Sequence, residues 1–208
     1  TYDAASNRTS VTTSVPGNAP RETLYTFDAL NRLKTVTDPE AGLTTYTYNA
    51  VGNLTLTQFP NQTAEKREYD WLNRLKYLEN RNTATDTVIS SYGYTLDSTG
   101  NRTAVDEHDG RHVEYDYDEL YRLVGESIFN PGVDPDTASP SRTVGYSYDP
   151  VGNRLTRTDS ADGTTAYTYD DNDRLLSEIA GGATTNYSYD DNGNTLSRTS
   201  ATDSVFYD

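Results

Sequence analysis

The stretch Tyr148-Asp149-Pro150-Val151-Gly152-Asn153-Arg154-Leu155 is one copy of a motif that recurs along the whole chain of 208 residues. The copies are located by the residue before the Asp or Asn of each motif: Tyr2, Phe27, Tyr48, Tyr69, Leu96, Tyr117, Tyr148, Tyr169, Tyr189 and Tyr207. Successive copies lie 18 to 31 residues apart, and most steps are 20 or 21 residues. A base period of this kind indicates a repeat architecture, in which each unit is stabilised by its neighbours.

Seven units contain a predicted β-strand that carries two aromatic residues two positions apart. In Thr44-Thr45-Tyr46-Thr47-Tyr48, Thr and Tyr alternate, and both residue types favour strands. Side chains two positions apart lie on the same face of a strand. We therefore expect an aromatic face of structural residues, made by Tyr25, Phe27, Tyr46, Tyr48, Tyr69, Tyr92, Tyr94, Tyr115, Tyr117, Tyr146, Tyr148, Tyr167, Tyr169, Tyr187 and Tyr189.

A tight turn follows the second aromatic residue. Asp149-Pro150-Val151-Gly152 has the preferences of a type I turn followed by a left-handed residue. The Asp carboxylate can accept backbone N–H bonds within the turn, and Gly or Asn tolerates positive φ at the fourth position. Tyr121 occupies that position in Asp118-Glu119-Leu120-Tyr121, so we expect this turn to be the least regular. The predicted structural turn residues are Asp28, Asn31, Asn49, Gly52, Asp70, Asn73, Asp97, Gly100, Asp118, Asp149, Gly152, Asp170, Asp190 and Gly193.

A second strand follows each turn, so that every unit is predicted to be a β-hairpin. One hairpin alone is marginally stable in water, but hairpins placed side by side pair their edges and bury the aromatic face. The expected fold is all-β, with tandem antiparallel hairpins forming a curved or spiralling sheet strip. About nine units of 20–21 residues make a single array over residues 1–208. The insertions at residues 15–20 and 130–140 are rich in Pro and Gly and are predicted to be loops.

The residue four positions after the Asp or Asn of the motif alternates between two types. It is Asn at Asn7, Asn53, Asn101, Asn153 and Asn194, and it is Arg at Arg32, Arg74, Arg122 and Arg174. We infer that successive hairpins lie in different environments, such as opposite edges of the strip. A relic of duplication without structural meaning is the alternative. The Arg side chains are expected to pair with neighbouring Asp residues and so to connect adjacent hairpins, each pair contributing little if it is exposed.

The composition excludes several classes of function. With 32 acidic and 17 basic residues the net charge is −15, which disfavours binding to nucleic acid or to an anionic membrane surface. No stretch approaches the ~20 apolar residues that cross a bilayer, so membrane insertion is not expected. Hydrophobic residues are only 33%, yet Tyr occurs 18 times, so the buried layer is predicted to be aromatic and thin. The absence of Cys excludes disulfides and Cys-based zinc sites.

The motif resembles the YD repeat, or Rhs repeat, over essentially the whole chain. That family includes bacterial Rhs and wall-associated polymorphic toxins, the shell subunits of Tc toxin complexes, and teneurins. The resemblance implies a strip of hairpins that spirals into a hollow shell, which in the toxin members encloses a C-terminal toxin or effector domain. Family shells contain more repeats, and this chain opens and closes within a motif, at Tyr2-Asp3 and Tyr207-Asp208. We therefore expect a shell segment, with enclosure as a property of the parent protein.

Few residues suggest chemistry. His108 and His112 flank a predicted Asp109-Gly110 turn and suit Zn or Ni, but we expect them to be exposed turn residues. The segment 190–194 offers oxygen ligands that calcium prefers, but it lacks the downstream Glu of an EF-hand, and turn formation already explains it. There is no nucleophile set, phosphate loop or dinucleotide motif. We predict no catalytic residue, no metal and no cofactor.

The leading hypothesis is a non-catalytic structural shell segment of a bacterial protein that is secreted or displayed on the cell surface. Its partners are the neighbouring repeats of the same parent chain and an enclosed toxin domain. One alternative is a surface adhesin whose aromatic face binds glycans. Another is an extracellular structural element that self-assembles through open sheet edges.

Overall fold

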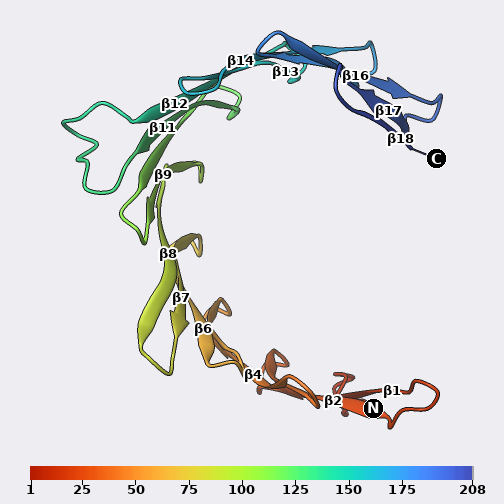
Figure 1. The fold of residues 1–208 in the computed structure, drawn as a ribbon. Coiled ribbons are helices and arrows are strands. Elements are labelled where there is room, and N and C mark those ends of the chain that lie inside the picture. The colour runs from red at the N-terminus through yellow and green to blue at the C-terminus, as the bar shows by residue number, and fades with distance from the viewer. Residues whose placement is uncertain (208) are drawn as a thin grey trace. The chain divides into compact units, whose positions relative to one another are not determined.

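The computed structural model describes residues 1–207, and Asp208 of the last motif lies outside the described residues. Within residues 1–207 there are 18 β-strands and no helix (Figure 1), so none is long and apolar enough to span a membrane. The predicted all-β fold of antiparallel hairpins is confirmed. The chain divides into two compact units, Thr1–Gly110 (unit 1) and Arg111–Asp208 (unit 2).

Unit 1 contains nine strands that pair in sequence order, each antiparallel to the next. They are β1 (Ser10–Thr13), β2 (Arg21–Phe27), β3 (Leu33–Asp38), β4 (Gly42–Tyr48), β5 (Leu54–Gln58), β6 (Thr63–Tyr69), β7 (Leu75–Asn82), β8 (Thr87–Leu96) and β9 (Arg102–Glu107). Strand β7 and strand β8 extend beyond their neighbours and form a long hairpin (Figure 1).

Unit 2 has the same organisation. Its strands are β10 (His112–Tyr117), β11 (Leu123–Phe129), β12 (Arg142–Tyr148), β13 (Arg154–Asp159), β14 (Gly163–Tyr169), β15 (Leu175–Ala180), β16 (Ala183–Tyr189), β17 (Thr195–Thr199) and β18 (Ser204–Phe206). The residues between β11 and β12 form the longest loop in this unit (Figure 1).

The motif turns are the turn of Asp3, which precedes β1, and the turns that follow the even-numbered strands β2, β4, β6, β8, β10, β12, β14 and β16. Because strands alternate in direction in a meander, all the motif turns of a unit lie at one edge of its sheet, here called the motif-turn edge. The loops that lead back to the next aromatic strand lie at the other edge, the connection edge. The suggestion of opposite edges, the example given for different environments of the two kinds of motif, is therefore wrong, because both kinds lie at the motif-turn edge.

Each hairpin of two strands that contains a motif turn has a β-bulge at the end of the strand pair next to that turn. In the hairpin of β4 and β5, Thr47 pairs with Leu56 and Tyr48 pairs with Leu54, so Thr55 is the extra residue. The same shift occurs ahead of the motif turn in the other hairpins, for example between Ser147 and Tyr148. The extra residue lies on the strand that follows the turn, and a bulge there bends that strand and increases its local twist.

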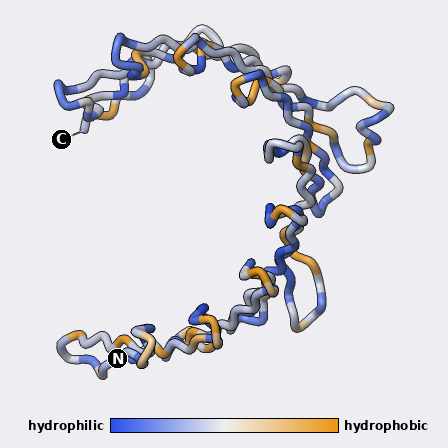
Figure 2. The backbone as a smooth tube through the Cα atoms, turned by 180° about the vertical axis from the view of Figure 1, so that it is seen from behind, coloured by the Kyte–Doolittle hydropathy of each residue, from blue (hydrophilic) through white to orange (hydrophobic). Residues whose placement is uncertain are grey.

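The sheets have little hydrophobic core. Among the described residues, the buried hydrophobic side chains are Ala64, Val105, Val113, Phe129 and Val144. Figure 2 shows hydrophobic and hydrophilic residues interspersed along the strands. Most of the aromatic residues are half-buried rather than buried. Strand pairing and polar side-chain contacts must therefore supply much of the stability that a core would give.

Candidate functional site

The motif turns are the most regular polar structures of the molecule, and the motif Asp organises them. In the turn after β12, Asp149 Oδ1 accepts the backbone N–H groups of Val151 at 3.1 Å, Gly152 at 2.7 Å and Asn153 at 2.8 Å. Gly152 has φ of 108°, in the region that favours glycine. Asn49 uses its amide oxygen in the same way, toward Val51 and Asn53.

These hydrogen bonds stabilise the ionised form of the motif Asp. Donation from the Arg32 backbone N–H lowers the pKa of Asp28, and the corresponding bond from Arg74 lowers the pKa of Asp70. In the turn after β8, the Thr99 hydroxyl is the largest cause, and it lowers the pKa of Asp97 to about 2. A carboxylate held in this way strengthens the turn at any pH above its pKa.

The turn at residues 118–121 is as regular as the others, although its fourth residue is Tyr. Tyr121 has φ of 61°, and its N–H donates to the Asp118 carbonyl at 2.9 Å. The expectation that this turn would be the least regular is wrong, because the Asp cap and the bulge determine its geometry. The cost is that a bulky residue is held in the left-handed region.

The Arg turns are the motif turns with Arg at the fourth residue after the Asp: those of Asp28, Asp70, Asp118 and Asp170. In each, the Arg Nε donates to the carboxylate of its own turn at 2.7 Å. The same guanidinium reaches the next hairpin: Arg74 Nη1 donates to the Asp97 carbonyl at 2.8 Å and Arg122 Nη1 donates to the Asp149 carbonyl at 3.0 Å. The predicted Arg–Asp pair therefore lies within one turn, and the connection between hairpins runs through a backbone carbonyl.

The Asn turns are those of Asp3, Asn49, Asp97, Asp149 and Asp190. Three of them, the turns of Asp3, Asn49 and Asp149, make a different contact with the following hairpin. Asn53 Nδ2 donates to Asn73 Oδ1 at 2.9 Å, and Asn153 Nδ2 donates to Asp173 Oδ1 at 2.7 Å. Asn7 makes the equivalent bond to Asn31 at 3.0 Å. The alternation of Asn and Arg thus corresponds to two alternating kinds of contact between neighbouring turns.

The left-handed residue of each turn matches the contact that arrives from the preceding turn. It carries an acceptor, such as Asn73 or Asp173, where an Asn side chain arrives. It is Gly where an Arg arrives, as at Gly52, and the positive φ of 99° accounts for this choice. A Cβ on Gly52 would make only an ordinary contact, 3.9 Å from Arg32 Nη1, and a Cβ on Gly152 would meet nothing within 4 Å. Sequence reasoning attributed both the Gly and the Asn positions to φ, which explains the Gly but not the acceptor side chains.

Five Tyr residues that directly precede a motif turn connect their hairpins to the preceding ones. The Tyr48 hydroxyl donates to the Leu33 carbonyl at 2.8 Å, and Tyr148 makes the equivalent bond to Leu123 at 2.7 Å. Tyr69, Tyr169 and Tyr189 repeat this bond at 2.9 to 3.0 Å. Burial raises the pKa of Tyr48. These side chains are therefore integral parts of the sheet.

Arginine side chains stack on the aromatic face. The Arg32 guanidinium carbon lies 4.6 Å from the centre of the Tyr48 ring, and that of Arg154 lies 4.7 Å from the centre of Tyr167. Contacts of this kind recur at Tyr94, Tyr148 and Tyr189. All the predicted aromatic residues lie in even-numbered strands, and all the predicted turn residues lie in motif turns.

Sequence reasoning missed a buried ion-pair cluster at the connection edge of unit 2. Asp159 is almost fully buried; it accepts from Arg142 Nε at 2.9 Å and also pairs with Arg157. Arg142 holds the pKa of Asp159 well below its usual range. Arg142 also reaches Asp162, in the turn that follows. A signal was present, because Asp38 occupies the position equivalent to Asp159 relative to its own motif.

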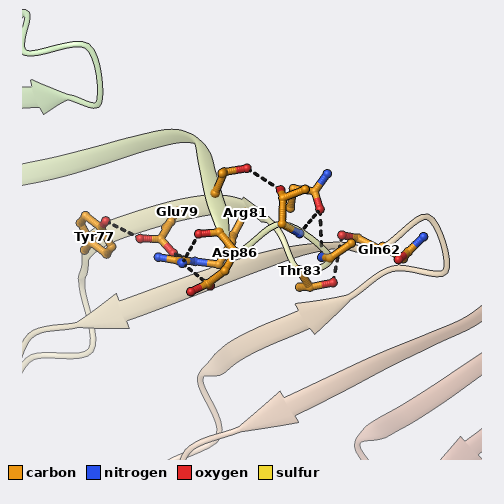
Figure 3. Close-up of polar contacts among 10 residues, drawn as sticks. Gln62, Tyr77, Glu79, Arg81, Thr83 and Asp86 are labelled. Carbon is orange, nitrogen blue, oxygen red and sulfur yellow. Dashed lines mark hydrogen bonds and ion pairs between the residues drawn. The ribbon is translucent and has the colours of Figure 1, made fainter.

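A second missed network lies in the long hairpin of β7 and β8 (Figure 3). Glu79 accepts from the Tyr77 hydroxyl at 2.9 Å and from Arg81 Nε at 2.8 Å. Arg81 Nη1 in turn donates to Asp86 Oδ1 at 2.6 Å. These bonds hold the hairpin loop in place, and the Arg81 side chain lowers the pKa of Glu79.

The residues considered for metal binding are placed as follows. The centre of the His112 ring lies 5.8 Å from the centre of the Phe129 ring, and the His108 backbone N–H donates to the Ser91 carbonyl. Asp190 uses its carboxylate oxygens to accept from Asn192 and Asn194, as the motif Asp of a turn does. Within residues 1–207 no group of three or more His, Asp or Glu side chains is placed to hold a metal ion.

Comparisons with known proteins identify the same repeats. The family model RHS Repeat matches residues 21–64 and 148–181. No curated protein matches the chain. A crystal structure of TcdB2-TccC3-TEV is similar over 100% of this chain and 14% of that chain, with a TM-score of 0.63 and 18% identity. Those of TcdB2-TccC3-Cdc42 and TcdB2-TccC3 are similar over 88% of this chain and 12% of theirs, with TM-scores of 0.56 and identities of 20% and 19%.

The structural similarities establish a shared fold, and the chain spans about one-seventh or less of the chains it matches. The family model covers hairpins in both units, and the motif it matches recurs in register through the hairpins that lie between and around them. The chain therefore carries RHS repeats, also called YD repeats, at residues 21–64 and 148–181.

Proposed function

We propose that the chain is a structural wall segment of a longer RHS-repeat protein, secreted or displayed by a bacterium, which encloses a C-terminal toxin or effector. The observation that carries the proposal is the chain of contacts between successive motif turns. Each Arg turn donates to a carbonyl of the next hairpin, and three of the Asn turns donate to a side chain there. A side-chain set repeated in this way maintains a continuous sheet.

The thinness of the sheets supports a wall rather than a catalyst. The described residues contain few buried hydrophobic side chains, and the charged clusters at Asp159 and Glu79 are satisfied by Arg and Tyr partners. The regular polar groups of the motif turns are likewise used within the turns or between them. The chemistry of these side chains is directed toward holding the sheet together.

The alternative of a glycan-binding aromatic face receives less support. Sugar binding needs open aromatic rings and available hydrogen-bonding groups. Five Tyr hydroxyls on this face donate to backbone carbonyls, and Arg side chains stack on several of the rings. A glycan array with the 208-residue protein is expected to show no specific binding, and a saturable hit would favour the adhesin.

Small-angle X-ray scattering of the 208-residue protein tests the wall. A compact globular domain of this length has a radius of gyration near ~17 Å. Because each unit is one sheet layer, we expect a clearly larger value, and a value near ~17 Å would overturn the proposal. Enclosure is tested in the parent polypeptide by limited proteolysis: the C-terminal domain is expected to resist protease until the repeat region is denatured. A C-terminal domain that is cleaved readily in the native protein would contradict enclosure and leave the wall intact.

A further inference from the structure

The most exposed large hydrophobic residues of unit 1 lie in successive motif turns. Leu30 is 68% exposed, Val51 is 69% exposed and Trp71 is 86% exposed, and Leu72 lies beside Trp71 in the same turn. In Figure 2 the motif turns project from the tube and are coloured in part orange. These four residues are here called the apolar row. Turn formation does not require apolar side chains at these positions, since Asn172 and Asn192 occupy the third position in two turns of unit 2.

The apolar row is electrically neutral, in a chain whose net charge is −15. Asp28 is paired with Arg32 and Asp70 is paired with Arg74, each at 2.7 Å, and the turn between them begins with the neutral Asn49. The last motif turns of unit 2 have no such row and instead expose acidic residues, such as Asp171 and Asp191. A second copy of this chain would be repelled over most of its surface but not at the apolar row.

The distance between the turns of the apolar row indicates which partner can bind to it. Successive motif turns are separated by two strands, which corresponds to about 9.6 Å. A partner that contacts all three turns together must present apolar groups at the same interval, and a second copy does so when the two rows run antiparallel. We propose that the apolar row is a two-fold contact between copies of this chain, with Val51 facing Val51 and Leu30 facing Trp71 and Leu72 of the other copy.

The contact is isologous, so that it closes on itself and does not propagate. Four side chains bury less area than the ~1,600 Å² of a standard interface, so the dimer is weak and depends on concentration. This contact differs from pairing through the outer strand β18, where Val205 and Phe206 are exposed. It also stands apart from the proposed wall function, because it concerns copies of the chain rather than its enclosed cargo.

Cysteine cross-linking tests the axis, because the chain contains no Cys. A disulfide needs Cβ atoms ~3.8 Å apart, which residue 51 provides only if it lies on the axis. We expect Val51→Cys to form a disulfide-linked dimer at least tenfold faster than Val151→Cys under the same mild oxidation. Val151 is the matched control, since it has the same turn position and is 74% exposed in unit 2. Equal rates for the two variants would overturn the proposal.

The single Trp gives a second readout on the unmodified protein. We expect Trp71 emission to shift to shorter wavelength, and the sedimentation coefficient to rise, as concentration increases. Val51→Asp places two carboxylates at the axis and is expected to abolish both changes. Far-UV circular dichroism verifies that this exposed substitution leaves the fold intact. Emission that is independent of concentration, or association that survives Val51→Asp but is lost in Val205→Pro, would refute the contact.

Discussion

The two edges of each sheet differ in how much the lengths of their turns and loops vary. In every motif turn, an Asn or Arg lies four residues after the Asp or Asn that begins the turn, so the turn length is constant. The loops of the connection edge range from two residues, at 181–182, to twelve residues, at 130–141. Side chains that must reach the next turn require a fixed distance, whereas a loop that only returns the chain does not. Contacts between neighbouring turns, and not the hairpin fold itself, therefore fix the length of the motif turn, while the connection loops let the length of the repeat vary.

An insertion gives the largest expected effect. Two Gly residues inserted after Ala50 would break four hydrogen bonds. Two of them run from the backbone N–H groups of Val51 and Asn53 to Asn49 Oδ1. The other two run from Arg32 to the Asn49 carbonyl and from the Asn53 side chain to Asn73. Four hydrogen bonds at about 1 kcal/mol each suggest a loss of about 3–4 kcal/mol. The same insertion after Gly132 is expected to cost less than about 0.6 kcal/mol. Urea denaturation monitored by circular dichroism measures both, and equal costs would show that the edges do not differ.

Asp159 is an exception at the connection edge, because its side-chain contacts are expected to matter for stability as much as those of the motif-turn edge do. Asp159→Ala leaves Arg142 and Arg157 without their buried partner. We expect the melting temperature to fall more than for any other single substitution at the connection edge, where Asp159 ends β13. Asp162→Ala is the matched control, because it removes only the exposed partner of Arg142. Similar melting temperatures for the two variants would mean that the buried cluster contributes little.

Acid is expected to weaken the motif turns. The folded pKa values of Asp28, Asp70, Asp118 and Asp170 are below the ordinary value of 3.8, and that of Asp97 is about 2. Groups with a lowered folded pKa contribute stability that is present above 3.8 and is lost as the pH falls through the folded pKa. The urea midpoint should therefore fall steeply between about pH 4 and pH 2. Asp97→Asn should reduce that slope, and an unchanged slope would assign the acid sensitivity elsewhere.

The Tyr contacts give the smallest expected effect. Tyr148→Phe removes one hydrogen bond to the Leu123 carbonyl and should cost about 1 kcal/mol. Tyr167→Phe is the control, because among the described residues no hydrogen bond from its hydroxyl is seen, and it should cost less than half as much. Chemical denaturation of the two variants decides whether the second aromatic residue of each pair differs from the first.

The sequence was sufficient to predict the hairpins because local rules determine them. Alternating Thr and Tyr set the strands, and the Asp and Gly of residues 149–152 set the turn. The regularity of the turn at Tyr121 was not predictable, since the bulge that supports it is a feature of strand register. The cluster at Asp159 was missed because its Arg partners come from different strands. The organisation as one array over residues 1–208 stays a prediction.

By itself, the sequence determined the period, the all-β class and the alternation of Asn with Arg, because each is written in neighbouring residues. Only the tertiary structure decided what that alternation does. The Arg74 bond to Asp97 and the Asn53 bond to Asn73 join residues about one repeat apart. Such contacts exist only once two hairpins are paired in register, which brings residues distant in sequence within hydrogen-bonding distance.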